Sequence, residues 1–137
     1  MNIFQKIIAR EIPATVIYED ADTLAFLDIG PIIKGHTLVI PKTPYLTLAE
    51  APEETLAALM RVCKIVAAAQ MKGLGADGVN IIQNNGAAAG QEVPHLHFHV
   101  IPRFKSDGHR WNWAAKKYTD PSEMAAIAAQ ICQGLSE

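Results

Sequence analysis

One heptapeptide, residues 95–101, constrains the fold of this chain more than any other segment. It reads HLHFHVI, so histidine alternates strictly with apolar residues. Successive side chains of a β-strand point to opposite faces of the sheet. The alternation therefore predicts a strand that buries Leu96, Phe98 and Val100 and carries three imidazoles on its other face. Three histidines in one register indicate a functional site.

The other segments predict a single α+β domain. Apolar residues at helical spacing predict helices over residues 3–10, 52–72 and 120–134, and β-branched or aromatic runs predict strands over residues 15–19, 23–28, 36–40 and 78–83. With residues 95–101 these strands would form an antiparallel sheet of about five strands, covered by the long helix 52–72, with a short N-terminal helix and a C-terminal helix. A length of 137 residues fits one domain. We assign residues 1–104 to it and residues 105–137 to a C-terminal extension packed on the same domain.

Composition and charge argue against several classes of protein. Twelve Lys and Arg stand against 14 Asp and Glu, a net charge of −2 without a basic run, which disfavours nucleic-acid binding. Apolar runs such as residues 65–69 are far shorter than the 18 or so residues of a membrane span. Residues 1–10 lack the apolar core of a signal peptide. Cys63 and Cys132 lie far apart in helical segments and predict no disulfide. We expect a cytoplasmic protein without a nucleic-acid or membrane partner.

The histidine row has three interpretations: side chains satisfied by the fold, a metal site, or imidazole chemistry. At about 3.3 Å per residue, His95 and His99 stand roughly 13 Å apart, so all three histidines cannot bind one zinc through bonds of about 2.1 Å. A zinc on two of them would need His36, Cys63 or a carboxylate, and no second cluster stands at ligand spacing. We expect neither a metal nor a cofactor. A neutral imidazole can instead attack phosphorus, while protonated neighbours stabilise oxygens or the leaving group.

The loop before the histidine row fits the same chemistry. Residues 84–94 contain Gly86 and Gly90 together with amide side chains. Backbone N–H groups and amides of such a loop can hold a phosphate without a large positive charge. Glycine and asparagine are also common in ordinary turns, so the loop alone decides nothing.

Residues 95–101 resemble, at every position, the signature of the histidine triad (HIT) family, in which histidine alternates with apolar residues and two apolar residues follow the third histidine. The resemblance extends in order through residues 3–8, 11–14, 24–29, 35–42 and 90–93, and covers residues 2 to 104. The chain is similar to the Hint-like branch of the family, whose members are nucleotide-binding phosphoramidases and hydrolases that work as homodimers. The resemblance therefore implies an α+β fold, a nucleotide substrate and a pair of chains.

The resemblance also implies a role for individual residues. His97 matches the nucleophile that forms a covalent nucleotidyl-histidine, His99 and His95 match its partners in handling the leaving group and protonation, and His36 matches a fourth histidine beside them. Asp28 matches the carboxylate that accepts bonds from the ribose hydroxyls. The implied apolar slot for a purine is Phe4, Ile7, Ile12 and Phe26, and the implied phosphate contacts are Asn84, Gln91 and Glu92.

Two positions depart from the family pattern. Many members of this branch begin with Cys-x-x-Cys and bind a structural zinc, but residues 2–5 of this chain read NIFQ, so that zinc is not expected. Glu92 stands where many members have serine, which leaves only a backbone N–H for the phosphate at that position.

From the sequence we expect a hydrolase of purine nucleoside phosphoramidates, or of related mononucleotide esters or anhydrides. It would act in two steps through a nucleotidyl-His97 intermediate, as a homodimer paired through the helix 52–72. A dinucleoside polyphosphate hydrolase and a non-catalytic nucleotide-binding interaction module remain as alternatives. Trp111 and Trp113 lie beyond the resemblance, and either anchor an interface or cap the core.

Overall fold

The structure is a computed structural model that describes residues 1–135 of the chain. Its helices are α1 (Ile3–Ile8), α2 (Glu53–Leu74) and α3 (Pro121–Gln133), and its strands are β1 (Val16–Glu19), β2 (Thr23–Leu27), β3 (Thr37–Pro41), β4 (Gly78–Gln83) and β5 (Phe98–Arg103), with 3₁₀ turns at Leu48–Glu50 and Ala87–Ala89. The predicted α+β class, with a five-stranded antiparallel sheet, is confirmed.

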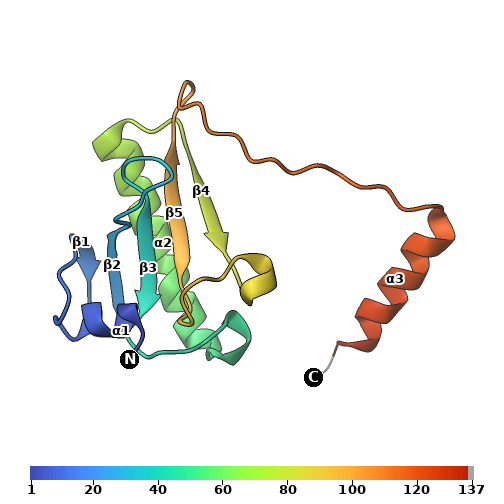
Figure 1. Ribbon diagram of the computed structural model, residues 1–137, viewed down its shortest axis with the longest axis horizontal. Coiled ribbons are helices and arrows are strands. Elements are labelled where there is room, and N and C mark those ends of the chain that lie inside the picture. Colours follow the sequence, from blue (N-terminus) through green and yellow to red (C-terminus); the bar gives the residue numbers. More distant parts are fainter. Residues whose placement is uncertain (136–137) are drawn as a thin grey trace.

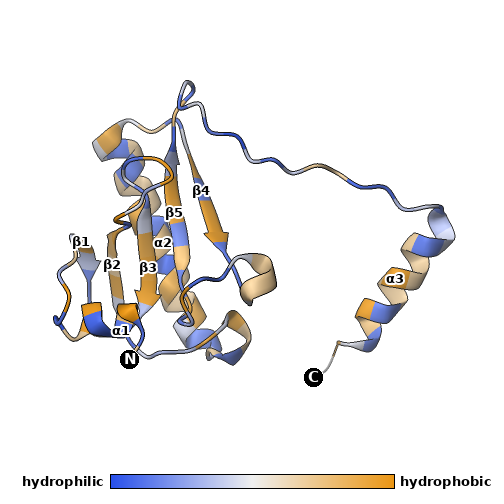
Figure 2. Cartoon of the chain, in the orientation of Figure 1, coloured by the Kyte–Doolittle hydropathy of each residue, from blue (hydrophilic) through white to orange (hydrophobic). Residues whose placement is uncertain are grey.

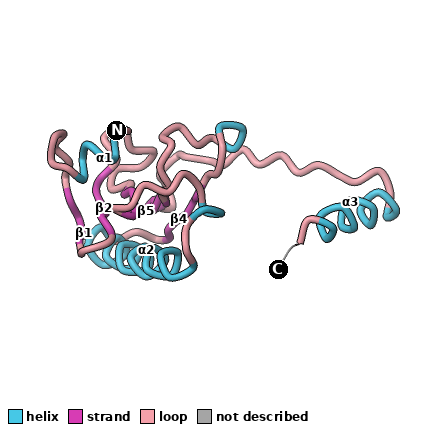
Figure 3. The backbone as a smooth tube through the Cα atoms, turned by 90° about the horizontal axis from the view of Figure 1, so that it is seen from below, coloured by secondary structure: helices cyan, strands magenta, loops and turns pink. Residues whose placement is uncertain are grey.

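The sheet has the strand order β1-β2-β3-β5-β4, and it lies between two layers (Figures 1 and 3). Helix α2 covers one face, and α1 lies on the other. Alternating side chains of the central strands fill both sides, because Ala25 and Val39 join the core under α2 while their neighbours join the core under α1. The core under α1 consists of Phe4, Ile7, Leu24, Phe26, Leu38 and Ile40.

Helix α2 has the charges and the cap that helix ends favour. Glu53 and Glu54 lie in its first turn, where negative charge interacts well with the helix dipole. The helix runs through Gly73, so its predicted end at residue 72 is too early. It stops at Gly75, whose φ of 67° is a left-handed conformation that glycine adopts without strain.

The histidine segment differs from the prediction in where its strand begins. Strand β5 starts at Phe98, so His95 and His97 precede it. Pairing with both β3 and β4 stops at Phe98, and a strand needs a partner to continue. The side chains nevertheless alternate as predicted: the apolar residues pack under α2, and the rings of His95 and His97 lie against Phe4 of α1.

The C-terminal arm, residues 112–135, leaves the domain. Trp111 is half-buried and donates its Nε1–H to Asn80 Oδ1 at 2.9 Å, whereas residues 112–135 are exposed throughout. Asp120 caps α3 as predicted, by accepting from the N–H of Glu123. The extended segment before it carries α3 away from the sheet, and α3 has no buried residue (Figure 1). We expected the extension to pack on its own domain, but within one chain residues 112–135 do not do so. Residues 136 and 137 lie outside the described residues.

Two smaller observations bear on the class of protein. Cys63 and Cys132 are both free, in agreement with the absence of a predicted disulfide. None of the helices formed by residues 1–135 combines the length and the hydropathy that crossing a bilayer requires.

Candidate active site

A cleft of ≈ 670 Å³ opens on the α1 side of the sheet. Most of its wall is apolar, with a few polar side chains, which is typical of pockets for small molecules. The lining includes eight of the residues predicted from the sequence, namely Phe4, Ile7, Ile12, Phe26, Asp28, Glu92, His97 and His99. The structure thus brings the predicted apolar slot, the carboxylate and two of the histidines into one site.

His97 presents an unprotonated ring nitrogen to this cleft. Its Nδ1 lies 2.7 Å from the backbone carbonyl oxygen of His95. A carbonyl only accepts, so Nδ1 carries the proton and donates it, and a neutral ring keeps its lone pair on Nε2. The side chain is 5% exposed and lines the cleft. A neutral imidazole held in this tautomer is a competent nucleophile.

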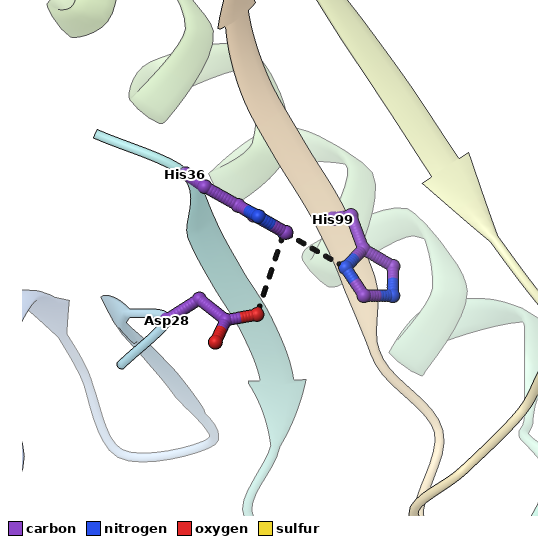
Figure 4. Close-up of side chains that lie close together, drawn as sticks. All are labelled: Asp28, His36 and His99. Carbon is purple, nitrogen blue, oxygen red and sulfur yellow. Dashed lines mark hydrogen bonds and ion pairs between the residues drawn. The ribbon is translucent and has the colours of Figure 1, made fainter. Parts of the chain in front are cut away.

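His36 and His99 form a hydrogen-bonded pair beside Asp28 (Figure 4). The N–H of Ile32 donates to His36 Nδ1 at 3.1 Å, so neutral His36 carries its proton on Nε2. That Nε2 lies 2.9 Å from His99 Nδ1 and 3.7 Å from Asp28 Oδ2. His36 therefore donates to His99, and neutral His99 keeps its own proton on Nε2. A backbone amide thus fixes the tautomers of both rings.

His95 is fully buried and does not line the cleft. Its Nε2–H donates to the Pro41 carbonyl at 2.8 Å, and its Nδ1 accepts from the Asn2 amide at 3.2 Å. The ring packs edge-on against Phe4, with centroids 5.7 Å apart. The side chain supports the site from behind, while its backbone carbonyl orients His97.

Burial keeps these imidazoles neutral. It lowers the pKa of His36, of His95 and of His97 below the usual 6.5, because a charged ring loses its hydration there. The pKa of His99 falls to about 4 through burial and through its repulsion by His97 and His36. Asp28 opposes this shift at His36, His97 and His99 without reversing it. At neutral pH the free lone pair of His97 is therefore available.

The sequence matches the HIT domain over residues 9–106. The chain belongs to the HIT family. An uncharacterized HIT-like protein of Methanocaldococcus jannaschii is 49% identical over 90% of this chain and 95% of its own length. The adenosine 5'-monophosphoramidase of Schizosaccharomyces pombe is 38% identical over 94% of each chain. A crystal structure of a HIT-family member from Bacillus subtilis matches with a TM-score of 0.90 and 39% identity, over 99% of this chain and 98% of that one.

Two of the predicted phosphate contacts lie outside the cleft of this HIT protein. Asn84 and Gln91 are not among the residues that line it. The Gln91 amide bonds three backbone groups instead: it accepts from the Gly86 N–H and donates to the carbonyls of Leu46 and Val93. Gln91 thus fixes the shape of the loop in this state, and the phosphate contacts of both residues stay predictions.

The HIT cleft also contains residues that the sequence did not single out. Residues 13–15 form part of the wall, although the sequence assigns none of them a role in the site. Asn2 stands where many family members have a cysteine, and the sequence assigns it no role, yet its side-chain amide donates to His95 Nδ1. Backbone partners such as the Ile32 N–H and the Pro41 carbonyl leave no signal in a sequence, because every residue type supplies them except the N–H of proline.

Within the described part of this HIT chain, one group of side chains is spaced closely enough to hold a metal ion. The ligand atoms of Asp28, His36 and His99 lie within 4.8 Å of one another. A metal on His36 Nε2 would displace the proton there, while Nδ1 is already accepting from the Ile32 N–H. The ring would then have no proton at all, whereas a histidine ligand normally keeps one N–H. The hydrogen bonds therefore fit a chain of proton donors better than a metal centre.

Proposed function

We propose that this HIT protein hydrolyses purine nucleoside phosphoramidates, or related conjugates of a nucleoside monophosphate, through a nucleotidyl-His97 intermediate. The observation that carries the proposal is the free Nε2 of His97 in an apolar cleft, with Nδ1 held by the His95 carbonyl. The Schizosaccharomyces pombe relative, named an adenosine 5'-monophosphoramidase, supports the substrate class. Buried neutral imidazole, rather than a metal-bound water, supplies the nucleophile.

The reaction has two displacements at phosphorus. In the first, His97 Nε2 forms a bond to phosphorus, the P–N bond breaks and the leaving amine takes up one proton. In the second, water attacks the phosphorus of nucleotidyl-His97, the N–P bond breaks, and the site regains one proton as the monophosphate leaves. Dividing hydrolysis in this way replaces one difficult step by two easier ones.

His99 is placed to give and regain that proton. A phosphate anion in the cleft favours the protonated form of a neighbouring imidazole, which offsets the lowered pKa of His99. Both nitrogens of His99 then carry protons, so the His36 Nε2–H loses its acceptor. Asp28 Oδ2, 3.7 Å away, provides an alternative acceptor for it. Asp28, His36 and His99 can thus exchange hydrogen-bond partners when His99 gains or loses its proton, and no donor is left unpaired.

The charges of the cleft favour an amine over a polyphosphate as leaving group. No lysine or arginine of residues 1–135 lines the cleft, whereas the carboxylates of Asp28 and Glu92 do. Like charges about 4 Å apart in water repel by about 1 kcal/mol, or roughly fivefold in a rate. A dinucleoside polyphosphate would bring several negative charges to these carboxylates. We therefore place that alternative second, and expect Glu92→Gln to raise turnover of diadenosine polyphosphates relative to the phosphoramidate.

The decisive experiment is mass spectrometry on protein mixed with adenosine 5'-phosphoramidate and stopped in alkaline denaturant, where the N–P bond of the adduct survives. One nucleoside monophosphate should be found on a peptide containing residues 95–99, and His97→Ala should remove it. Turnover without an adduct would contradict the covalent route. Nucleotide binding with neither adduct nor turnover would favour the non-catalytic binding module.

A further inference from the structure

Helix α2 carries one amide side chain into the interior of the domain. Polar and apolar residues are interleaved along this helix (Figure 2), and its lysine, arginine and glutamate side chains are exposed. Gln70 is buried instead, with 5% of its surface exposed. A buried amide costs free energy unless its polar groups find partners, so the partners of Gln70 indicate what the side chain does.

The partners of Gln70 lie beside the paired histidines. Its Nε2 is 3.0 Å from the Gly35 carbonyl oxygen and 2.9 Å from the Val100 carbonyl oxygen. A carbonyl only accepts, so the NH₂ group of the amide donates to both of them. Gly35 immediately precedes His36, and Val100 immediately follows His99. One side chain of α2 therefore joins the two stretches of backbone that carry these histidines.

This bridge lies where the pairing of the two strands ends. Strands β3 and β5 pair as far as Thr37 and Val100. His36 lies one residue beyond the paired part of β3, whereas His99 lies within the paired part of β5. The His99 ring lines the cleft on the α1 side, and Figure 4 shows α2 behind the two strands. Gln70 thus bonds both segments from the face of the sheet opposite the cleft.

The end of α2 also packs on the turn before His36. The φ of Gly35 is 103°, and a Cβ atom there would lie 2.7 Å from Leu74 Cδ1 and 3.1 Å from Pro102 Cγ. Glycine adopts this conformation without strain, and its missing side chain lets α2 and β5 approach each other. The position of His36 relative to β5 therefore depends on α2, and Gln70 supplies the hydrogen bonds of that contact.

We propose that Gln70 is a positioning residue, which holds His36 and His99 at the separation that their hydrogen bond requires. His36 Nε2 and His99 Nδ1 are 2.9 Å apart, and atoms about 3.6 Å apart no longer form a hydrogen bond. A shift of less than about 1 Å between β3 and β5 therefore leaves His99 free to carry its proton on either nitrogen. For catalysis the proposal rests on the function proposed above, in which His99 protonates the leaving amine. Loss of the bridge then slows turnover without weakening nucleotide binding, because Gln70 does not line the cleft.

The first experiment tests the positioning without a nucleotide. Gln70→Met keeps the length of the side chain and removes both donors, and Gln70→Glu keeps its shape while a carboxyl group donates to one carbonyl at most, so neither variant can form the bridge. Long-range ¹H–¹⁵N spectra of the full chain, assigned with His36→Gln and His99→Gln, report which ring nitrogens are protonated. We expect His99 of the wild type to carry its proton on Nε2, and both Gln70 variants to show a mixture of tautomers. His36 Nε2–H should also exchange with solvent about tenfold faster or more. Wild-type tautomers and exchange in either folded variant would overturn the proposal.

Val66→Ala is the matched control. Val66 is buried in the core one turn earlier on α2 and has no polar side-chain atom, so its truncation lowers the free energy of unfolding without affecting the bridge. For adenosine 5'-phosphoramidate we expect Gln70→Met to lower kcat about 10- to 100-fold with KM nearly unchanged, and Val66→Ala to retain the wild-type kcat. Equal losses of kcat in the two variants would show that Gln70 contributes only stability, and would overturn the proposal. If the wild type itself shows no turnover, the proposed function fails, while the imidazole spectra still decide the role of Gln70.

Discussion

His95→Leu should cost the protein stability rather than catalysis. The ring of His95 is fully buried, and leucine has a similar volume but cannot donate to the Pro41 carbonyl or accept from Asn2. A buried acceptor left without a donor costs about 1–3 kcal/mol, and the altered shape adds about 1 kcal/mol. We therefore expect the free energy of unfolding to fall by about 2–4 kcal/mol.

Turnover should survive the same change. The hydrogen bond that holds His97 in its reactive tautomer comes from the backbone carbonyl of residue 95, which leucine also supplies. A small shift of that carbonyl, worth about 1.4 kcal/mol or less in the barrier, would lower kcat by tenfold or less. His97→Ala should give the opposite profile, with turnover lost and the fold retained.

Urea unfolding and the kcat for adenosine 5'-phosphoramidate, measured on both variants, test this division of roles. Unfolding is followed at one protein concentration, because association of chains would make it depend on concentration. The reasoning is refuted if His95→Leu unfolds like the wild type and yet loses turnover as completely as His97→Ala. In that case the His95 ring would act in the chemistry, as the resemblance to the family implies.

Asp28→Ala should weaken a ribonucleotide about tenfold or more, the value of a charge-assisted bond of about 1.5–3 kcal/mol, and a dideoxyribose analogue much less; equal losses in calorimetry would show that Asp28 does not bind the sugar. Dialysis against EDTA should leave turnover unchanged, and zinc lost together with activity would contradict this. Because burial lowers the pKa of His99 from 6.5 to about 4, the unfolding free energy should be highest above pH 6.5 and fall as the pH drops toward 4; His99→Gln should flatten that decline in urea titrations. Ala69→Glu, on the exposed side of α2, should weaken association in sedimentation without unfolding the subunit.

The alternation of side chains along residues 95–101 could be predicted, and the start of β5 could not. Alternation depends only on an extended backbone, which the residue types of this segment favour locally. A strand boundary depends on where the neighbouring strands end, and β3 and β4 stop pairing at Phe98. For the same reason the sequence predicted α3 and its Asp120 cap, which are local, but not that α3 lies away from the sheet (Figure 1).

The site could be predicted as a set of residues but not as a set of roles. The pattern places three histidines on one face, yet only His97 and His99 line the cleft. What separates them from His95 is the Pro41 carbonyl, a partner more than 50 residues away along the chain. The resemblance to the family supplied the roles of Asp28 and His36, which residue type and spacing alone do not indicate.

The spacing of two residues between the histidines has a physical reason in this structure. A catalytic imidazole must be held in one tautomer, and in hydrolases with a serine nucleophile a buried carboxylate does this. Here the carbonyl two residues earlier holds His97, and a backbone N–H, acting through His36, holds His99. Neutral backbone groups avoid the cost of burying a charge, and they leave the pKa of His97 low enough for its lone pair to be free at neutral pH. The apolar residues between the histidines anchor this backbone under α2, so the alternation places the nucleophile and also selects its tautomer.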